Sequence, residues 1–168
     1  AQMEVLPIYA ETAPHYLTFT DEIYERADGL YFLCSPPFRK KEDIDKLWAG
    51  FKHGSPTFTG TDHSSFTPKD KEKFLERREG KLVPDFSKVA NGIPGIEVRL
   101  PILLNGVNEG KLTLMDLVKI FSTNAAKIFG MYPQKGIIDI GSDADLVIVD
   151  LKKERVLSAK SLHMHIDF

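Results

Sequence analysis

Apolar side chains recur at helical spacing in the middle of the chain. Ile44, Leu47, Trp48 and Phe51 follow an i, i+3, i+4, i+7 pattern, with charged residues between them. Because an α-helix has 3.6 residues per turn, these four side chains share one face. The pattern therefore predicts a helix that buries this face and ends at Gly54.

A second helix is predicted near residue 113, where Thr113 and Asp116 have the spacing of a capping box. A shorter helix over residues 125–129 should follow, with Gly130 just past its end, where glycine tolerates the left-handed backbone. The stripe expected to be buried by the first of these two helices consists of Leu114, Leu117, Val118 and Phe121.

Two β-favouring runs lie upstream of these helices. Residues 5–10 predict a strand that cannot continue through Pro14, since proline lacks the N–H needed in the middle of a sheet. Residues 56–63 predict a second strand with polar residues at its carboxyl end. Residues 64–97 are expected to be irregular, and the mixed-sign charge run over residues 69–81 indicates a solvated helix or lid.

The pattern changes after Pro133, where β-rich runs at residues 136–138 and 146–149 are separated by turn-forming residues. Strands alternate with helices before this point, and only strands are predicted after it. This order indicates an α/β fold followed by a β module. We therefore expect two domains, covering residues 1–133 and 134–168.

Composition narrows the class of protein. The 168 residues include 22 basic and 24 acidic side chains, a formal net charge of −2, which favours neither a nucleic-acid partner nor a membrane surface. A single cysteine, Cys34, rules out an internal disulfide and favours a cytoplasmic location. No apolar run approaches the ~18 residues of a membrane span, and residues 1–4 do not resemble a signal peptide. A complete (β/α)₈ barrel needs roughly 250 residues, which this chain does not have.

The most specific candidate for chemistry is the pair Asp62-His63, at the carboxyl end of the second predicted strand. α/β folds place catalytic groups at such strand ends. An aspartate there can bind a metal ion or move a proton, and a histidine can orient or protonate a reacting group. For these two residues taken alone, a simple loop cap by Asp62 is the commoner explanation.

Two loops add candidates for ligand binding. Ser35 is followed by two prolines that fix the backbone, so its main-chain groups could hold a planar amide ligand, or the segment could be a rigid connection. The loop over residues 91–97 begins with Asn91 and contains glycines that permit close approach of a ligand, or that simply form turns.

Histidines are the other candidate ligands. His163 and His165 would face the same side of a strand and could hold zinc, although no third ligand lies nearby in the sequence. His15 and His53 are isolated and are expected to be structural or solvated. Cys34 lies in an apolar run and is expected to be an inert buried thiol.

Six segments carry a family resemblance. They are residues 11–17 (ETAPHYL), 34–39 (CSPPFR), 61–63 (TDH), 91–97 (NGIPGIE), 122–130 (STNAAKIFG) and 141–146 (GSDADL). In this order they closely resemble the C-terminal part of dihydropyrimidinases and D-hydantoinases, which are cyclic amidohydrolases of the metal-dependent amidohydrolase superfamily. Each segment alone is a weak signal, but the six together span nearly the whole chain.

The resemblance implies the last two β/α units of a TIM barrel, followed by part of a β-sandwich. It also implies two metal ions, usually zinc, which activate a water for attack on the amide carbonyl of a small cyclic ureide. Asp62 matches a metal ligand that takes the proton of this water and passes it to the leaving nitrogen. Ser35 and Asn91 match positions whose main-chain groups hold the amide edge of the substrate, and His63 matches a residue that orients Asp62.

The family's other metal ligands are a His-x-His pair, a carbamylated lysine and two further histidines, and none has a counterpart here. One aspartate cannot hold two metals, so the chain alone is expected to be inactive. Allantoinases and dihydroorotases share the Pro-His-Tyr and Asp-His motifs and stay open as alternatives. Non-catalytic dihydropyrimidinase-related scaffold proteins are a third, although they lack the Asp-His pair. The resemblance implies a homotetramer for the complete enzyme, and a partial barrel should associate through its exposed apolar surface.

Overall fold

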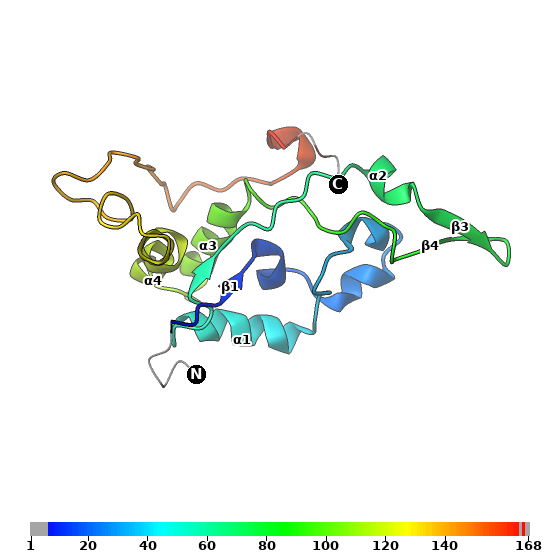
Figure 1. Ribbon diagram of the computed structural model, residues 1–168, viewed down its shortest axis with the longest axis horizontal. Helices are drawn as coiled ribbons and strands as arrows, with labels where there is room; N and C mark the ends of the chain where they lie inside the picture. Colours follow the sequence, from blue (N-terminus) through cyan, green and yellow to red (C-terminus); the bar gives the residue numbers. More distant parts are fainter. Residues whose placement is uncertain (1–6, 165, 167–168) are drawn as a thin grey trace.

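Two short strands lie near the centre of the structure, a computed structural model that describes residues 7–164 and 166 (Figure 1). A hairpin projects at one end, and a long irregular segment forms the other. The strands are β1 (Glu11–Thr12), β2 (Phe58–Thr59), β3 (Leu75–Arg78) and β4 (Lys81–Pro84). The α-helices are α1 (Lys41–Phe51), α2 (Pro68–Glu72), α3 (Arg99–Asn108), α4 (Leu114–Val118) and α5 (Asn124–Ile128).

β1 and β2 form a parallel pair, with Glu11 opposite Phe58 and Thr12 opposite Thr59. The connection between them contains α1, so residues 11–59 are a β-α-β unit, as parallel strands require. This confirms the α/β class expected from the sequence.

The boundaries of the two predicted strands differ from expectation. The run over residues 5–10 lies partly outside the described residues, and β1 begins one residue after it. Pro14 then opens a 3-10 turn, where its missing N–H is harmless. β2 occupies two residues of the run 56–63. Beyond it, the backbone of His63 makes a parallel bridge to Ile93, so the polar end of the run still pairs with another segment.

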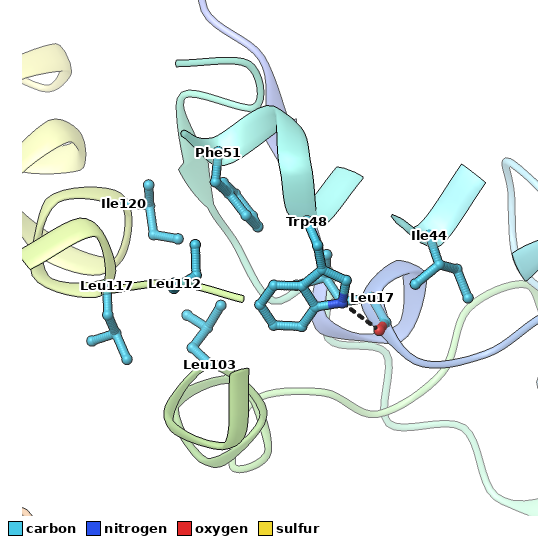
Figure 2. Close-up of a cluster of buried hydrophobic side chains, with 8 residues drawn as sticks. All are labelled: Leu17, Ile44, Trp48, Phe51, Leu103, Leu112, Leu117 and Ile120. Carbon is cyan, nitrogen blue, oxygen red and sulfur yellow. Dashed lines mark hydrogen bonds between the residues drawn. The ribbon is translucent and has the colours of Figure 1, made fainter. Parts of the chain in front are cut away.

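Helix α1 buries the face predicted for it (Figure 2). Ile44, Trp48 and Phe51 are each about one-twentieth exposed, and the Trp48 indole N–H donates to the Leu17 carbonyl at 3.1 Å. Gly106 of α3 lies against the indole ring, leaving no room for a side chain. The buried members of this hydrophobic cluster are Leu17, Ile44, Trp48, Phe51, Leu103, Leu112, Leu117 and Ile120.

Helix α4 has the predicted capping box, in which the Thr113 hydroxyl accepts from the Asp116 amide and the Asp116 carboxylate accepts from the Thr113 amide. The expected stripe is only partly right, because Leu114 and Val118 are exposed and Leu117 is buried. A π-helical turn over Lys119–Thr123 follows. Ile120, within this turn, is buried although it lies outside the predicted stripe.

The region expected to be irregular contains more regular structure than predicted. The charge run forms α2 and the β3–β4 hairpin, which turns at Glu79-Gly80. Both residues have positive φ, 51° and 79°, as a two-residue type I′ turn requires. Helix α3 was also not predicted, although it supplies Leu103 to the buried core.

Residues 136–149 do not form the strands that their composition predicts. Within the described residues they have no strand partner, and Ile138, Ile140 and Ile148 are almost fully exposed. Figure 1 shows this segment as an irregular extension away from α5. A strand needs a neighbouring strand for its backbone hydrogen bonds, and no described segment offers one here. The domain boundary near residue 133 stays a prediction.

Candidate functional site

Asp62 lies three residues beyond β2, where the chain turns sharply. Its φ is 45°, a left-handed conformation in which aspartate is tolerated better than most residues. The carboxylate is about half exposed, with 56% of the side-chain surface accessible. The backbone therefore presents Asp62 at the end of a strand, as the sequence predicted, with the carboxylate open to a ligand.

His15 faces this carboxylate, with its Nε2 3.8 Å from Asp62 Oδ2. The ring is only 3% exposed, and neither ring nitrogen has a hydrogen-bond partner among the described residues. Burial lowers the pKa of the imidazole, and the charge of Asp62 opposes that shift. Of the two expected roles for His15, structural or solvated, its burial agrees with the structural one, and its contact with Asp62 was not predicted from the sequence.

His63 has a different contact from the one expected. Its Nδ1 accepts a hydrogen bond from the Gly95 amide at 3.1 Å. The next amide along the chain, that of Ser64, donates to the Ile93 carbonyl at 3.0 Å. His63 thus ties the turn after Asp62 to the loop over residues 91–97, and its predicted action on Asp62 stays a prediction.

The two predicted ligand-binding loops meet each other. The side-chain amide of Asn91 donates to the Ser35 hydroxyl at 2.8 Å, although 56 residues separate them. Close by, the Gly92 amide donates to the Leu33 carbonyl at 2.9 Å. Ser35 and Asn91 are both exposed, so their main-chain groups lie at the surface beside the junction of the loops.

A buried lysine that the sequence did not single out joins the same loops. Lys71 of α2 is completely buried, and its ammonium donates to the carbonyls of Leu33, Ala90 and Gly92 at 3.3, 3.0 and 2.7 Å. In the sequence Lys71 is one of several lysines in a charge run. No local pattern distinguishes it, because all three partners come from distant segments.

Cys34 and Tyr16 support the segment that carries Ser35. The Tyr16 hydroxyl donates to the Pro36 carbonyl at 2.8 Å. Burial raises the pKa of the Cys34 thiol and that of the Tyr16 phenol, so both keep their protons at neutral pH. A protonated, buried thiol is a poor nucleophile, which agrees with the inert role predicted for Cys34.

The described residues do not make a metal centre by themselves. They contain no group of three histidine, cysteine, aspartate or glutamate side chains that could hold a metal ion. Asp62 and His15 offer at most two donors, fewer than the roughly three protein ligands of a catalytic zinc. His163 instead pairs with Glu97, Nδ1 to Oε2 at 2.9 Å, and His165 lies outside the described residues.

A cavity of about 480 Å³ lies beside the site without containing it. His15, Ile93 and Pro94 line one part of it, and residues between 157 and 164, together with Ile166, contribute to the rest. Ser35, Asp62 and Asn91, the predicted site residues, are not among the residues that line it. Separately, no helix in the described part of the chain has both the length and the apolar character needed to cross a bilayer.

Comparison with known proteins identifies the class to which this arrangement belongs. The profile of the Amidohydrolase family matches residues 9–165, nearly the whole chain, and the chain is a member of this family. Within it, the chain is 37% identical over 163 residues to the D-phenylhydantoinase of Escherichia coli O1:K1, covering 96% of this chain and 34% of that protein.

Solved structures agree with the sequence comparison. The dihydropyrimidinase of Brevibacillus agri NCHU1002 superposes with a TM-score of 0.90 at 39% identity, covering 99% of this chain and 35% of that one. The L-hydantoinase of Arthrobacter aurescens superposes with a TM-score of 0.82, also at 39% identity, covering 95% and 34%. The chain therefore shares the amidohydrolase fold of the hydantoinases and dihydropyrimidinases, and spans about a third of their length.

Proposed function

We propose that this chain is part of a cyclic amidohydrolase that acts on hydantoins or dihydropyrimidines. It is the part that binds the substrate and protonates it. The observation that carries the proposal is the convergence of three predicted positions. The Asn91–Ser35 hydrogen bond joins the two loops, and the His63–Ile93 bridge joins one of them to the turn that bears Asp62. Relatives named for hydantoin and dihydropyrimidine hydrolysis share this fold at 35–40% identity.

The chemistry assigned to the chain is proton transfer and orientation. Main-chain groups of Ser35 and Asn91 hold the amide edge of the ring, and the prolines after Ser35 keep that backbone rigid. Water adds to the ring carbonyl, Asp62 accepts a proton from it, and the carboxylic acid returns this proton to the ring nitrogen as the C–N bond breaks. The product is the ring-opened carbamoyl acid.

The complete site is proposed to use zinc, which would polarise the carbonyl and acidify the water. Asp62 is the ligand that this chain would supply. The remaining ligands would come from beyond the described residues, because these contain no group of three histidine, cysteine, aspartate or glutamate side chains that could hold a metal ion. A homo-oligomer is the proposed assembly, as the family resemblance implies, and the cytoplasm is the proposed location, which the single cysteine favours.

The test is a chimera in which this chain replaces the matching third of the E. coli D-phenylhydantoinase. The chimera loaded with zinc should open hydantoin or dihydrouracil with a higher kcat/KM than allantoin or dihydroorotate. A folded chimera that prefers allantoin or dihydroorotate would point to those enzymes instead. A folded chimera with no activity on any of the four would support the scaffold alternative.

A further inference from the structure

The loops that carry Ser35 and Asn91 are long irregular segments, yet they meet with definite geometry. Asn91 donates to Ser35 through one hydrogen bond between exposed side chains, which contributes little by itself. The Gly92 amide adds one main-chain bond to Leu33. Something more must hold the two backbones at a fixed distance.

Lys71 lies behind this junction and is bonded to both loops. Its ammonium donates to Leu33, two residues before Ser35, and to Ala90 and Gly92, on either side of Asn91. An ammonium group has three N–H donors, which match these three carbonyl acceptors. The side chain approaches from α2, whose own N-terminus is capped by Thr67 and Asp70.

We infer that Lys71 is a positioning residue, which sets the relative placement of the Ser35 and Asn91 backbones and thereby the edge that receives the substrate amide. The inference rests on the function proposed above. Burial lowers the pKa of Lys71 to about 8, so the ammonium is still mostly charged at neutral pH and keeps all three donors. Hydrogen bonds from a charged donor are about twice as strong as neutral ones, which suits a group that must fix three carbonyls.

Replacing Lys71 with methionine keeps an unbranched side chain, one atom shorter, and removes the donors. In the 168-residue chain, Lys71→Met should speed hydrogen exchange at the Gly92 amide by about tenfold or more, the effect of losing roughly 1.4 kcal/mol of local protection. Exchange in the middle of α1 should not change. Lys69→Met and Lys73→Met alter exposed lysines on either side of Lys71 and serve as matched controls that should change neither.

In the chimera, Lys71→Met should raise KM for hydantoin about tenfold while kcat stays within about threefold, because a misplaced binding edge weakens substrate binding more than proton transfer. Three results would each overturn the inference: an unchanged KM, a tenfold loss that appears in kcat instead of KM, or faster hydrogen exchange throughout α1. If Lys71→Met does not fold, Lys71→Gln retains an NH₂ donor and should give an intermediate KM. Failure of both variants to fold would assign Lys71 to global stability instead.

The two proposals fail in different ways. An unsubstituted chimera without activity would reject the hydrolytic function, whereas the exchange rate at Gly92 would still report whether Lys71 holds the loops. An active chimera whose KM does not respond to Lys71→Met would reject the positioning role alone.

Discussion

The side-chain amide of Asn91 donates a hydrogen bond to the hydroxyl of Ser35 at 2.8 Å, so two positions that are 56 residues apart are direct neighbours. Both residues were predicted to present main-chain groups to a substrate amide. Their contact means that neither loop is placed independently of the other. A change in one should therefore be felt by the other.

This coupling is testable with a double-mutant cycle in the chimera. Asn91→Ala and Ser35→Ala each remove one partner of the hydrogen bond, so each should raise KM. The main-chain groups that bind the substrate remain in both variants, so the expected increase is moderate, about three- to tenfold. The double variant should be no worse than the poorer single variant, with a coupling of about 0.5–1.5 kcal/mol. Strictly additive effects on KM would show that the hydrogen bond does not connect the two binding positions.

Asp62 should matter for the rate of reaction rather than for folding. Asp62→Asn keeps the size of the side chain but removes the proton acceptor, so kcat of the chimera should fall by roughly 10²- to 10⁴-fold. Asp45→Asn, at an exposed carboxylate of α1 paired with Lys41, is the matched control and should leave kcat unchanged. A fall of less than tenfold in Asp62→Asn would contradict its role in proton transfer.

The parts of this fold that the sequence predicted are those that depend on near neighbours in the chain. The α1 stripe and the Thr113–Asp116 cap involve residues three to seven positions apart, and both are present. The strand-like run over residues 146–149 needs a partner strand from elsewhere, and the described chain provides none. Its composition therefore predicted a strand that does not form here.

The same distinction holds for the site. Asp62 was recognisable because it follows a strand-like run. Lys71 and His15 were not, because burial and distant partners give them their significance: Lys71 contacts carbonyls 19 to 38 residues away, and His15 faces a carboxylate 47 residues away. In isolation, a lysine in a charge run and a lone histidine carry no signal of such contacts.

The fit between Gly106 and Trp48 should make α3 intolerant of even one methyl group. A Cβ at Gly106 would come within 2.5 Å of the indole ring. Overpacking of this kind costs about 1–3 kcal/mol, more than the ~0.5–1 kcal/mol that alanine gains in a helix. Gly106→Ala should therefore lower the urea midpoint of the chain.

A smaller ring at position 48 should relieve this clash. In a Trp48→Phe background, Gly106→Ala is expected to be neutral or stabilising, because the atoms that it would meet are gone. If Gly106→Ala is equally harmful in both backgrounds, the cause is not contact with the indole.

Lys71 should give the chain a characteristic dependence of stability on pH. Its pKa is about 8 in the folded chain and near 10.5 when unfolded, so between these values the folded chain has released a proton that the unfolded chain keeps. Unfolding then takes up a proton, and the contribution of this group to the free energy of unfolding rises with pH across that window.

The buried Cys34 and Tyr16 act in the opposite direction, because their pKa values are raised by folding. The contribution of Lys71 is therefore measured as the difference between the wild-type chain and Lys71→Met, by calorimetry in buffers of different ionisation enthalpy. Between pH 8 and 10.5, the wild-type chain should take up more protons on unfolding than Lys71→Met does. Lys73→Met should match the wild-type chain. Equal uptake in all three proteins would contradict the lowered pKa.

The exposed apolar side chains after residue 136 should drive the isolated chain to associate. Ile138, Ile140 and Ile148 are almost fully exposed in one irregular segment, and large exposed apolar patches are rare on monomers. Sedimentation velocity should show oligomers of the 168-residue chain, and Ile138→Lys with Ile148→Lys should shift them toward monomer. Lys152→Glu and Lys153→Glu, in the exposed polar stretch just beyond, are the control and should leave the distribution unchanged. A single sharp monomer boundary for the unsubstituted chain would contradict this prediction, because it would show that the exposed segment does not drive association.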